Sequence, residues 1–322
     1  MNLSLSLVVT AYKAEALDIV SLELRRPAGG DLPAFEPGAH LEIALTRTAD
    51  ENESLIRHYS LCNDPSERHR YVIAVGRAKD GRGGSEAVHT RVRIGTKLVA
   101  HAPRNNFRLL SDAPHYQFIA GGVGITPILC MIRWCVSHGK SWSLLYCTRS
   151  RVRAAFYEEL QGHGEQVQFH FDDEASTVPD IHDLLKRVPN NAQLYCCGPF
   201  ALMKAVEKES SGRPAGSVHF EWFSAAPRES EAKETAFKVI LRSSGRRLDV
   251  MPHRSILETL EANGVSVPFS CREGLCRTCE VGLCEGEADH RDFVLSDLER
   301  RQQESVIVCV SRSKTRSLLL DL

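Results

Sequence analysis

The sequence predicts a chain of three modules that differ in fold class: an antiparallel β module, an α/β module with a parallel sheet, and a compact α+β module. Three observations lead to this prediction. Short alternating segments between Gly/Pro turns fill roughly the first 107 residues, strands alternate with helices from His115 onward, and cysteines gather in a last module after a polar stretch. With 322 residues, the chain has room for two or three domains of ordinary size.

The first module, expected over residues 1–108, is built from short segments in which polar and apolar residues alternate. Strands of this kind at such spacing are typical of an antiparallel β-barrel or sandwich. The expected strands are residues 3–10, 20–24, 40–45, 58–61, 71–75 and 97–100. The N-terminus alternates like a strand and lacks the basic region and cleavage site of a signal peptide, so we expect a cytoplasmic chain.

Strands and helices alternate in the second module, expected over residues 109–226, as in a doubly wound parallel sheet. An apolar strand at 115–120 runs into the turn GGVGITP and a helical run at 128–139, and residues 193–209 repeat strand, turn and helix. Ligands of such sheets bind at the carboxyl ends of the strands, where glycines let a pyrophosphate approach backbone N–H groups. The turns AGGVGITP and YCCGP would therefore face one crevice. Cys197 could lie near a nicotinamide there, or be a small buried residue.

A linker separates the second module from the third. Residues 224–234 are small, polar or charged, and we place the linker at 227–235. The third module, expected over 236–322, opens with a hairpin that turns at residues 243–245. A helix follows, with Ser255 and Glu258 as a capping box and Gly264 at its end.

The third module carries the most specific motif of the chain, a group of cysteines. Cys271, Cys276 and Cys279 follow the spacing C-x4-C-x2-C, and Cys309 follows after 29 intervening residues. This is the plant-type ferredoxin spacing, in which four thiolates hold a [2Fe–2S] cluster. The alternatives are a structural zinc site, which favours paired C-x2–4-C knuckles, and a ligand set in which Cys284 replaces Cys309. An odd total of 11 cysteines favours thiols and metal ligands over a disulfide framework.

Two segments of the first module have the groups that a flavin site needs. The segment RHYSL places Arg57, Tyr59 and Ser60 together: a cation for phosphate, a flat ring for packing, and a hydroxyl for the edge of an isoalloxazine ring. The segment GRGGS opens an expected short helix, whose first backbone amides can hold phosphate. On local grounds, each segment can also be half-buried surface or a Ser-capped loop.

Charge and hydropathy exclude two classes of partner. The formal net charge is −1, and no basic stripe or charged tail favours binding to nucleic acid. No run approaches the roughly 18 apolar residues that a membrane span needs. We therefore expect no nucleic acid and no membrane as partners.

Seven motifs in order resemble one family over essentially the whole chain. RHYSLCNDP, GRGGS, PRNNF, IAGGVGITP, CGP, HFEWF and CREGLC..C fall where they do in the phthalate dioxygenase reductase and vanillate demethylase reductase group of the ferredoxin–NADP reductase superfamily. The resemblance implies an antiparallel β-barrel flavin domain, an α/β parallel-sheet nucleotide domain and a plant-type ferredoxin domain of α+β, β-grasp fold. It implies FMN contacts from Arg57, Tyr59, Ser60, Gly83, Gly84, Ser85 and Phe223, NADH contacts from Gly121, Gly122, Gly124, Thr126, Pro127, Cys197, Gly198 and Pro199, and cluster ligands Cys271, Cys276, Cys279 and Cys309.

The activity implied by the resemblance is that of an NADH-dependent iron–sulfur flavoprotein reductase. Hydride would pass from NADH to FMN, and single electrons would pass through the [2Fe–2S] cluster to a separate Rieske-type oxygenase, one acting on an aromatic acid or related small molecule. This chemistry needs positioning and no residue as general acid or base, and the family expectation is a monomer. Two alternatives stay open: a flavin/Fe–S redox sensor with a regulatory protein partner, and a binding module stabilised by a structural zinc ion.

Two groups of arginines leave details open. Arg149 and Arg151, after the second strand of the α/β module, could accept the 2′-phosphate of NADPH or form a solvated loop. The family usually has glycine between the second and third cysteines, where this chain has Arg277, whose charge could raise the cluster potential or mark a different docking surface. Arg272, Arg277 and Arg291 could form a docking patch near the cluster or simply be solvated.

Overall fold

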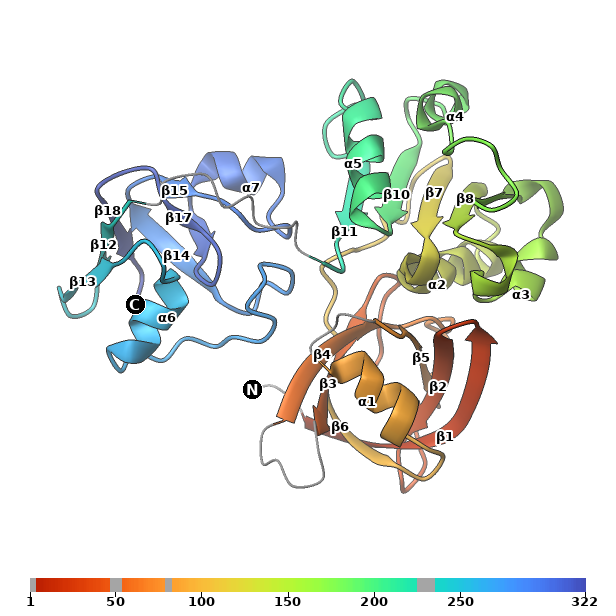
Figure 1. Cartoon of the computed structure of the whole chain (residues 1–322), viewed down its shortest axis with the longest axis horizontal. Helices are drawn as coiled ribbons and strands as arrows, with labels where there is room; N and C mark the ends of the chain where they lie inside the picture. Colours follow the sequence, from red (N-terminus) through yellow and green to blue (C-terminus); the bar gives the residue numbers. More distant parts are fainter. Residues whose placement is uncertain (1–3, 47–53, 79–82, 225–234) are drawn as a thin grey trace. The chain divides into compact units, whose positions relative to one another are not determined.

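The computed structural model describes residues 4–46, 54–78, 83–224 and 235–322 (Figure 1). The chain divides into two compact units, Met1–Phe223 and Ser224–Leu322. The linker expected at 227–235 lies outside the described residues except for its last one. No helix in the described ranges is both long and apolar enough to cross a membrane.

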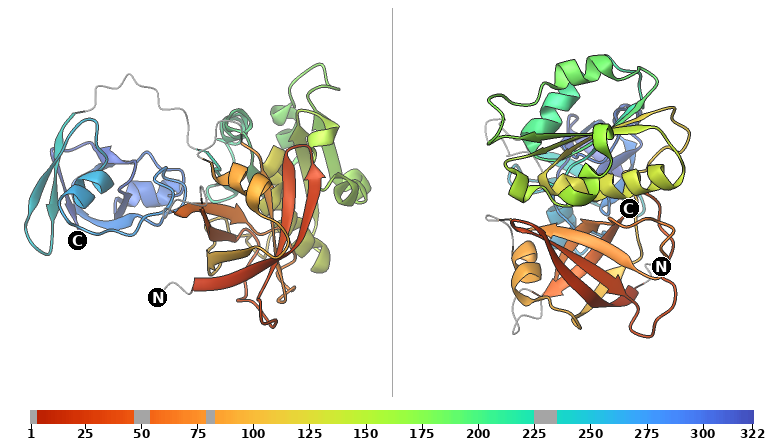
Figure 2. Two further views of the ribbon diagram at one scale, coloured as in Figure 1. Left: turned by 60° about the horizontal axis from the view of Figure 1, so that its bottom comes forward. Right: turned by 90° about the vertical axis from the view of Figure 1, so that its right-hand side faces the viewer.

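The first unit begins with an antiparallel barrel, as expected. Its six-stranded sheet has the order β4-β3-β6-β1-β2-β5, and a bridge between Leu61 and Ile73 joins its two edges. Alternating apolar residues such as Leu22 and Leu41 are fully buried, and Val88 of the helix α1 packs into the same core. Figure 2 shows the curved strands of the barrel. The elements are β1 (Ser4–Ala16), β2 (Ile19–Arg25), β3 (His40–Thr46), β4 (Ser54–Ser60), β5 (Tyr71–Gly76), α1 (Gly84–Arg91) and β6 (Lys97–His101).

The rest of the first unit is a parallel sheet of five strands in the order β11-β10-β7-β8-β9, which confirms the predicted α/β fold. Phe118 on β7 packs toward α2 and α3, whereas its neighbour Ile119 packs toward α4 and α5. Figure 1 shows these helices beside the strands of the sheet. Helices therefore cover both faces of the sheet. The elements are β7 (Tyr116–Gly121), α2 (Ile125–Ser137), β8 (Trp142–Thr148), α3 (Tyr157–Gln161), β9 (Val167–Phe171), α4 (Ile181–Arg187), β10 (Gln193–Cys197), α5 (Phe200–Glu209) and β11 (Val218–Glu221).

The barrel and the parallel sheet share a core. Cys62 and Ala74 of the barrel belong to the same buried cluster as the α2 side chains, and Arg133 on α2 donates to the Cys62 carbonyl at 2.8 Å. A Cβ added at Gly76, at the end of β5, would lie 3.2 Å from Val123 Cβ in the turn after β7. The carboxyl end of β7 therefore lies against the barrel. The module boundary at residue 108 stays a prediction.

The second unit is a mixed five-stranded sheet in the order β13-β12-β18-β14-β16, packed against α6, beside a two-stranded sheet of β15 and β17. The predicted hairpin and the Ser255–Glu258 capping box are both confirmed. The elements are β12 (Phe237–Leu241), β13 (Arg247–Val250), α6 (Ile256–Ala262), β14 (Glu280–Glu285), β15 (Ala288–Asp289), α7 (Asp297–Gln302), β16 (Ser305–Ile307), β17 (Arg312–Ser313) and β18 (Ser317–Leu320).

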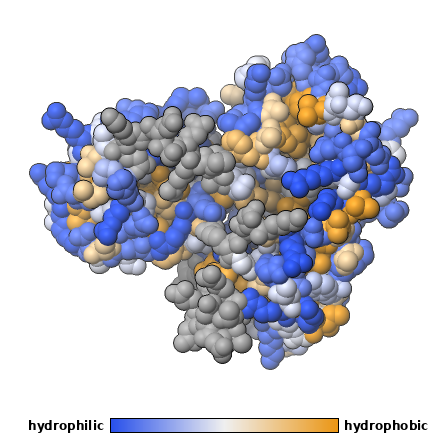
Figure 3. Space-filling view, in the orientation of Figure 1, coloured by the Kyte–Doolittle hydropathy of each residue, from blue (hydrophilic) through white to orange (hydrophobic). Residues whose placement is uncertain are grey.

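The view in Figure 3 shows a surface that is mostly hydrophilic, with hydrophobic side chains in smaller areas. Large apolar residues that are exposed, such as Ile94, Val178 and Leu298, come from separate elements and loops. Scattered exposure of this kind is normal for a folded protein and does not by itself indicate a binding surface.

Candidate functional site

Strand β4 presents Arg57, Tyr59 and Ser60 at the barrel wall next to the start of α1. A Cβ added at Gly84 would lie 2.5 Å from Arg57 Nε, so only glycine lets α1 begin against this arginine. The Tyr59 hydroxyl is buried and has no hydrogen-bond partner among the described residues. Burial also raises the pKa of Tyr59, so its hydroxyl stays protonated. An enclosed phenol without a partner is costly, and a bound ligand would satisfy it.

Helix starts in the described chain fall into two groups. Among helices longer than five residues, α4, α6 and α7 have a capping side chain, from Asp180, Ser255 and Ser296 respectively. The helices α1, α2 and α5 have none, and their N-cap positions are Gly83, Gly124 and Pro199. These three starts follow GRGG, AGGVG and CGP, the turns expected to bind phosphate or nucleotide. The N–H groups that open α1 and α5 are therefore available to an anion, whereas the Ile125 N–H at the start of α2 already bonds the carbonyls of Gly122 and Val123.

The two turns of the parallel sheet touch each other. A Cβ added at Gly124 would lie 2.3 Å from the Cys197 carbonyl oxygen, and one at Gly121 would lie 2.4 Å from Pro199 Cδ. These glycines thus allow the turns to pack together, a structural role beyond the approach of a pyrophosphate that the sequence suggested. Gly122 differs, because its φ of 53° is left-handed and a Cβ there would meet nothing within 4 Å.

The other predicted residues of these turns support the backbone. Thr126 is buried and donates from Oγ1 to the Val123 carbonyl at 3.0 Å, which closes the first turn of α2. Pro127 is buried in the same turn, and Gly198 follows β10 directly against Gly121. Phe223 is the last residue of the first unit and is 41% exposed.

Glu221 is a candidate residue that the sequence did not suggest. The parallel pairing of β10 with β11 places it opposite Cys197, and Ser60 Oγ donates to its Oε2 at 3.2 Å. Burial of its carboxyl group raises the pKa of Glu221 to about 8. Burial also raises the pKa of Cys197 well above its ordinary value, so this cysteine is a neutral thiol. One contact thus joins the end of β4 to the ends of β10 and β11.

The four predicted cysteines come together in the second unit as two pairs. Cys271 lies beside Cys276, Cys279 lies beside Cys309, and Cys309 also contacts Cys271. The backbone of the loop points toward sulfur: the N–H groups of Glu273 and Leu275 donate to Cys271 Sγ at 3.3 and 3.4 Å. Hydrogen bonds from the Cys276 and Cys309 thiols hold the pKa of Cys271 well below its ordinary value.

This donor set suits a two-iron cluster, because each iron takes one pair of thiolates. No three His, Cys, Asp or Glu side chains in the described ranges form a group that could hold one metal ion. The alternative ligand Cys284 is exposed on β14, where Arg242 Nη1 lies 3.8 Å from its sulfur. The geometry therefore favours Cys309 as the fourth ligand.

The arginines near the cysteines are all engaged. Arg277 has a left-handed φ of 64°, and its guanidinium pairs with Glu280 at 2.6 Å and also with Glu299 on α7. Arg272 pairs with Glu261 and lies over the Phe269 ring, and Arg291 pairs with Asp289. Each of the three arginines expected to form a docking patch therefore already has a carboxylate partner within the second unit.

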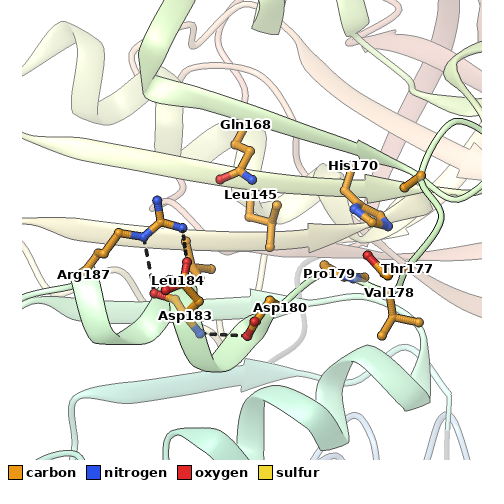
Figure 4. Close-up of a pocket in the computed structure, with 11 residues that line it drawn as sticks. Leu145, Gln168, His170, Thr177, Val178, Pro179, Asp180, Asp183, Leu184 and Arg187 are labelled. Atoms are coloured by element: carbon orange, nitrogen blue, oxygen red, sulfur yellow. Dashed lines mark hydrogen bonds and ion pairs between the residues drawn. The ribbon is translucent and has the colours of Figure 1, made fainter.

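A cavity of about 230 Å³ lies on the face of the parallel sheet that α4 covers (Figure 4). Its lining includes Gln168 and His170 from β9, and the ion pair between Asp183 and Arg187 on α4. None of the predicted site residues lines it. The cavity is thus separate from the turns at the carboxyl ends of β7 and β10.

Two segments of the chain match known domain families. Residues 118–208 match the oxidoreductase NAD-binding domain, and residues 239–314 match the 2Fe-2S iron-sulfur cluster binding domain. Phenoxybenzoate dioxygenase subunit beta of Ectopseudomonas oleovorans is 42% identical over 319 residues, covering 99% of this chain and 97% of the relative. Phthalate dioxygenase reductase of Burkholderia cepacia is 42% identical over 323 residues, again covering 99% and 97%.

Solved structures are similar over the same length. The structure of phthalate dioxygenase reductase, described as modular for electron transfer from pyridine nucleotides to [2Fe–2S], has 40% identity and a TM-score of 0.72, with 99% and 98% coverage. An intact type IV self-sufficient cytochrome P450 monooxygenase has 34% identity and a TM-score of 0.88. That match covers 99% of this chain but 41% of the P450 chain, so this chain spans about two fifths of the P450's length.

Proposed function

The chain belongs to the family of oxygenase reductases that includes phthalate dioxygenase reductase, and within that family we propose the role of each site and the class of the partner. The protein takes hydride from NADH and passes electrons one at a time through a [2Fe–2S] cluster to an oxygenase. Bound FMN supplies the conversion of a two-electron donor into single electrons. The protein itself binds the nucleotide and the cofactors, orients them toward one another and shields the site of hydride transfer from water.

The flavin site consists of the β4 residues and the uncapped start of α1. Arg57 pairs with the FMN phosphate, and the amides that open α1 after Gly83 add neutral donors, with Gly84 and Ser85 in the same turn. The Tyr59 side chain would contact the flavin, and its buried hydroxyl would gain the partner it otherwise lacks. Phe223, at the end of the first unit, would add a further flavin contact.

The nicotinamide end of NADH lies at the meeting point of Ser60, Cys197 and Glu221. The supporting observation is the hydrogen bond of 3.2 Å between Ser60 and Glu221, next to Cys197. It brings the strand that holds the flavin and the turn that holds the nucleotide into one site. As a neutral thiol, Cys197 offers a small polarizable surface to the ring and takes no part in redox chemistry.

The remaining nucleotide contacts come from the uncapped starts of α2 and α5. The pyrophosphate of NADH is held by backbone N–H groups at the start of α5 and in the turn of Gly122–Gly124 before α2, where Gly122 leaves open space beside the chain. The contributing residues are Gly121, Gly122, Gly124, Thr126, Pro127, Cys197, Gly198 and Pro199.

The second unit holds the cluster and meets the partner. Cys271, Cys276, Cys279 and Cys309 are the ligands. The partner is a Rieske-type oxygenase that acts on an aromatic acid or related small molecule, and the relatives named for phenoxybenzoate and phthalate dioxygenases support the oxygenase and the aromatic acid. We further propose that the protein is a cytoplasmic monomer with domains at 1–108, 109–226 and 236–322.

An anaerobic visible spectrum before and after NADH tests the electron path. We expect a flavin band and a broad [2Fe–2S] absorbance, both bleached by NADH. Cofactor colours that ignore NADH would favour a redox sensor, and a colourless protein containing zinc would rule out the proposal. Stopped-flow reduction of the Glu221→Ala variant, which lacks the hydrogen bond with Ser60, then tests the hydride site, and we expect a rate about tenfold to a hundredfold lower, because a small misplacement of the nicotinamide is costly. An unchanged rate would contradict a role for Glu221.

A partner assay distinguishes two classes of oxygenase. The reduced protein is mixed anaerobically with a Rieske oxygenase component or with a cytochrome P450, which is the second candidate because of the similarity to the P450-fused reductase. Faster bleaching of the Rieske centre supports the proposal, and faster reduction of P450 haem contradicts it.

A further inference from the structure

Two turns of opposite charge lie side by side at the carboxyl ends of β8 and β9. The basic turn follows β8 and contains Arg149, Arg151 and Arg153, while the acidic turn, residues 172–174, follows β9. Backbone hydrogen bonds tie them: the Asp173 N–H donates to the Arg149 carbonyl at 3.1 Å. Three basic and three acidic side chains leave the two turns with no net charge.

Glu174 holds Arg151 in a two-point ion pair. Arg151 Nε lies 3.3 Å from Oε1 and Nη2 lies 3.2 Å from Oε2 of this glutamate. Its third nitrogen, Nη1, donates to the Tyr157 hydroxyl at 3.0 Å, and its guanidinium lies over the rings of Tyr157 and Phe171. The guanidinium of Arg151 is thus fully engaged.

The neighbouring arginines are placed differently. Arg153 pairs with Asp18 of the barrel at 3.0 Å. Arg149 is exposed and makes no ion pair within the described ranges, but its turn lies against the acidic one. The expectation that Arg149 or Arg151 could accept a 2′-phosphate thus meets an ion-paired counter-charge at Arg151, whereas Arg149 contacts the acidic turn through its backbone carbonyl.

The position of these turns is where the adenosine half of a dinucleotide would lie. A dinucleotide crosses the carboxyl ends of a parallel sheet, and its adenosine ribose reaches the strand beyond the phosphate-binding one. Here the phosphate-binding turn follows β7, and β8 and β9 are the next strands on the side away from β10. NADH and NADPH differ at this ribose by one dianionic phosphate, for which a free guanidinium is a strong partner.

We propose that Glu174 sets the preference for NADH over NADPH by holding the Arg151 guanidinium and by placing a negative charge beside the 2′ position of the ribose. Without Glu174, the Arg151 guanidinium would pair with the 2′-phosphate. The ion pair with Glu174 prevents this pairing. This inference rests on the proposed NADH site at the ends of β7 and β10.

The test is the second-order rate of anaerobic flavin reduction by each nucleotide, measured on the full chain loaded with its cofactors. We expect Glu174→Gln to raise the ratio of the NADPH rate to the NADH rate by about tenfold, since one repulsion is removed and one ion pair becomes available. The double variant Arg151→Gln/Glu174→Gln should lose most of that gain. Asp183→Asn is the matched control, because it removes an exposed acid that is likewise paired with an arginine, Arg187 on helix α4, and it should leave the ratio unchanged.

Equilibrium binding of 2′,5′-ADP against 5′-ADP, measured by titration calorimetry, gives a second readout that needs no turnover. The Glu174→Gln variant should bind 2′,5′-ADP more tightly relative to 5′-ADP, and the double variant should not. An unchanged ratio in Glu174→Gln, or a gain that persists without Arg151, would overturn the inference. Failure of NADH to reduce the wild-type flavin would instead overturn the proposed function, so the two failures are distinct.

Discussion

At the scale of single residues, the carboxyl group of Glu221 has the clearest effect on pH dependence. Burial raises its pKa from 4.5 to about 8, so the folded protein holds a proton that the unfolded chain releases. The free energy of unfolding should therefore fall as the pH rises from about 4.5 to about 8, and the loss is complete above that range. Glu221→Gln is neutral at every pH and should lack this decline.

Thermal release of flavin fluorescence between pH 5 and 9 measures the difference for the first unit. Between pH 5 and pH 9, the transition temperature of the wild type should fall by more than that of Glu221→Gln. Parallel curves for the two proteins would show that the carboxyl group does not hold its proton in the folded state.

The cysteines give a second prediction at this scale. Replacing Cys309 by alanine removes one member of the Cys279–Cys309 pair, so the protein should lose its [2Fe–2S] absorbance and most of its bound iron. Cys284→Ala is the control, because Cys284 is exposed and lies outside both pairs, and it should keep a full cluster. Iron and sulfide analysis checks both variants, and the reverse result would make Cys284 the fourth ligand.

Residues differ in how well the sequence reveals them. The spacing of the four cysteines is a local signal, and the fold brings these four side chains together, while their role as cluster ligands stays a prediction. Glu221 has no such signal, because it sits among aromatic residues and becomes a site candidate only when β11 pairs with β10 and meets Ser60. The packing role of Gly124 was also hidden, since it depends on a turn more than 70 residues away.

At the scale of elements, Arg277 connects the cysteine loop to β14 and α7. Its cation is shared by the carboxylates of Glu280 and Glu299, so the three groups carry one net negative charge. Arg277→Gly leaves two uncompensated carboxylates near the cluster and should lower its reduction potential, on the order of 20 mV for one partly solvated charge. Glu299→Gln removes one negative charge and should raise the potential by a similar amount.

Redox titration followed by electron paramagnetic resonance measures both shifts on the full protein. Glycine adopts the left-handed φ at position 277 without strain, so the loop itself should keep its shape. Shifts of the same sign in both variants would mean that loop geometry, and not charge, controls the potential.

Elements with local signals were predicted well, and elements that depend on distant pairing were not. The six barrel strands, the strand at β8 and the capped helix α6 follow from alternation, apolar runs and capping residues. Short strands such as β9 and β11, and the polar helix α4, have weak periodicity of their own. Strands β14 to β18 form ladders between segments far apart in the sequence, so only the assembled sheet defines them.

At the scale of the whole molecule, the two units divide the chemistry between them. All proposed flavin and nicotinamide residues lie in Met1–Phe223, and all four cluster cysteines lie in Ser224–Leu322. Hydride transfer therefore needs only side chains of the first unit, while delivery of single electrons to a protein partner needs the second. The fold class of both units was predicted from the sequence, because each has its own pattern of strands and helices.

This division predicts how a variant without the cluster behaves. Cys279→Ser breaks one thiol pair and should remove the cluster. No residue of the first unit changes, so the rate at which NADH reduces the flavin should stay within about twofold of the wild type. The rate at which the protein reduces the small oxidant ferricyanide with NADH should also stay within about twofold. Reduction of an oxygenase's Rieske centre should fall by more than a hundredfold, because the flavin then has no one-electron carrier between it and the partner. If the variant still reduced the oxygenase efficiently, electrons would leave directly from the first unit. The cluster would then serve the stability of the second unit and not the electron path.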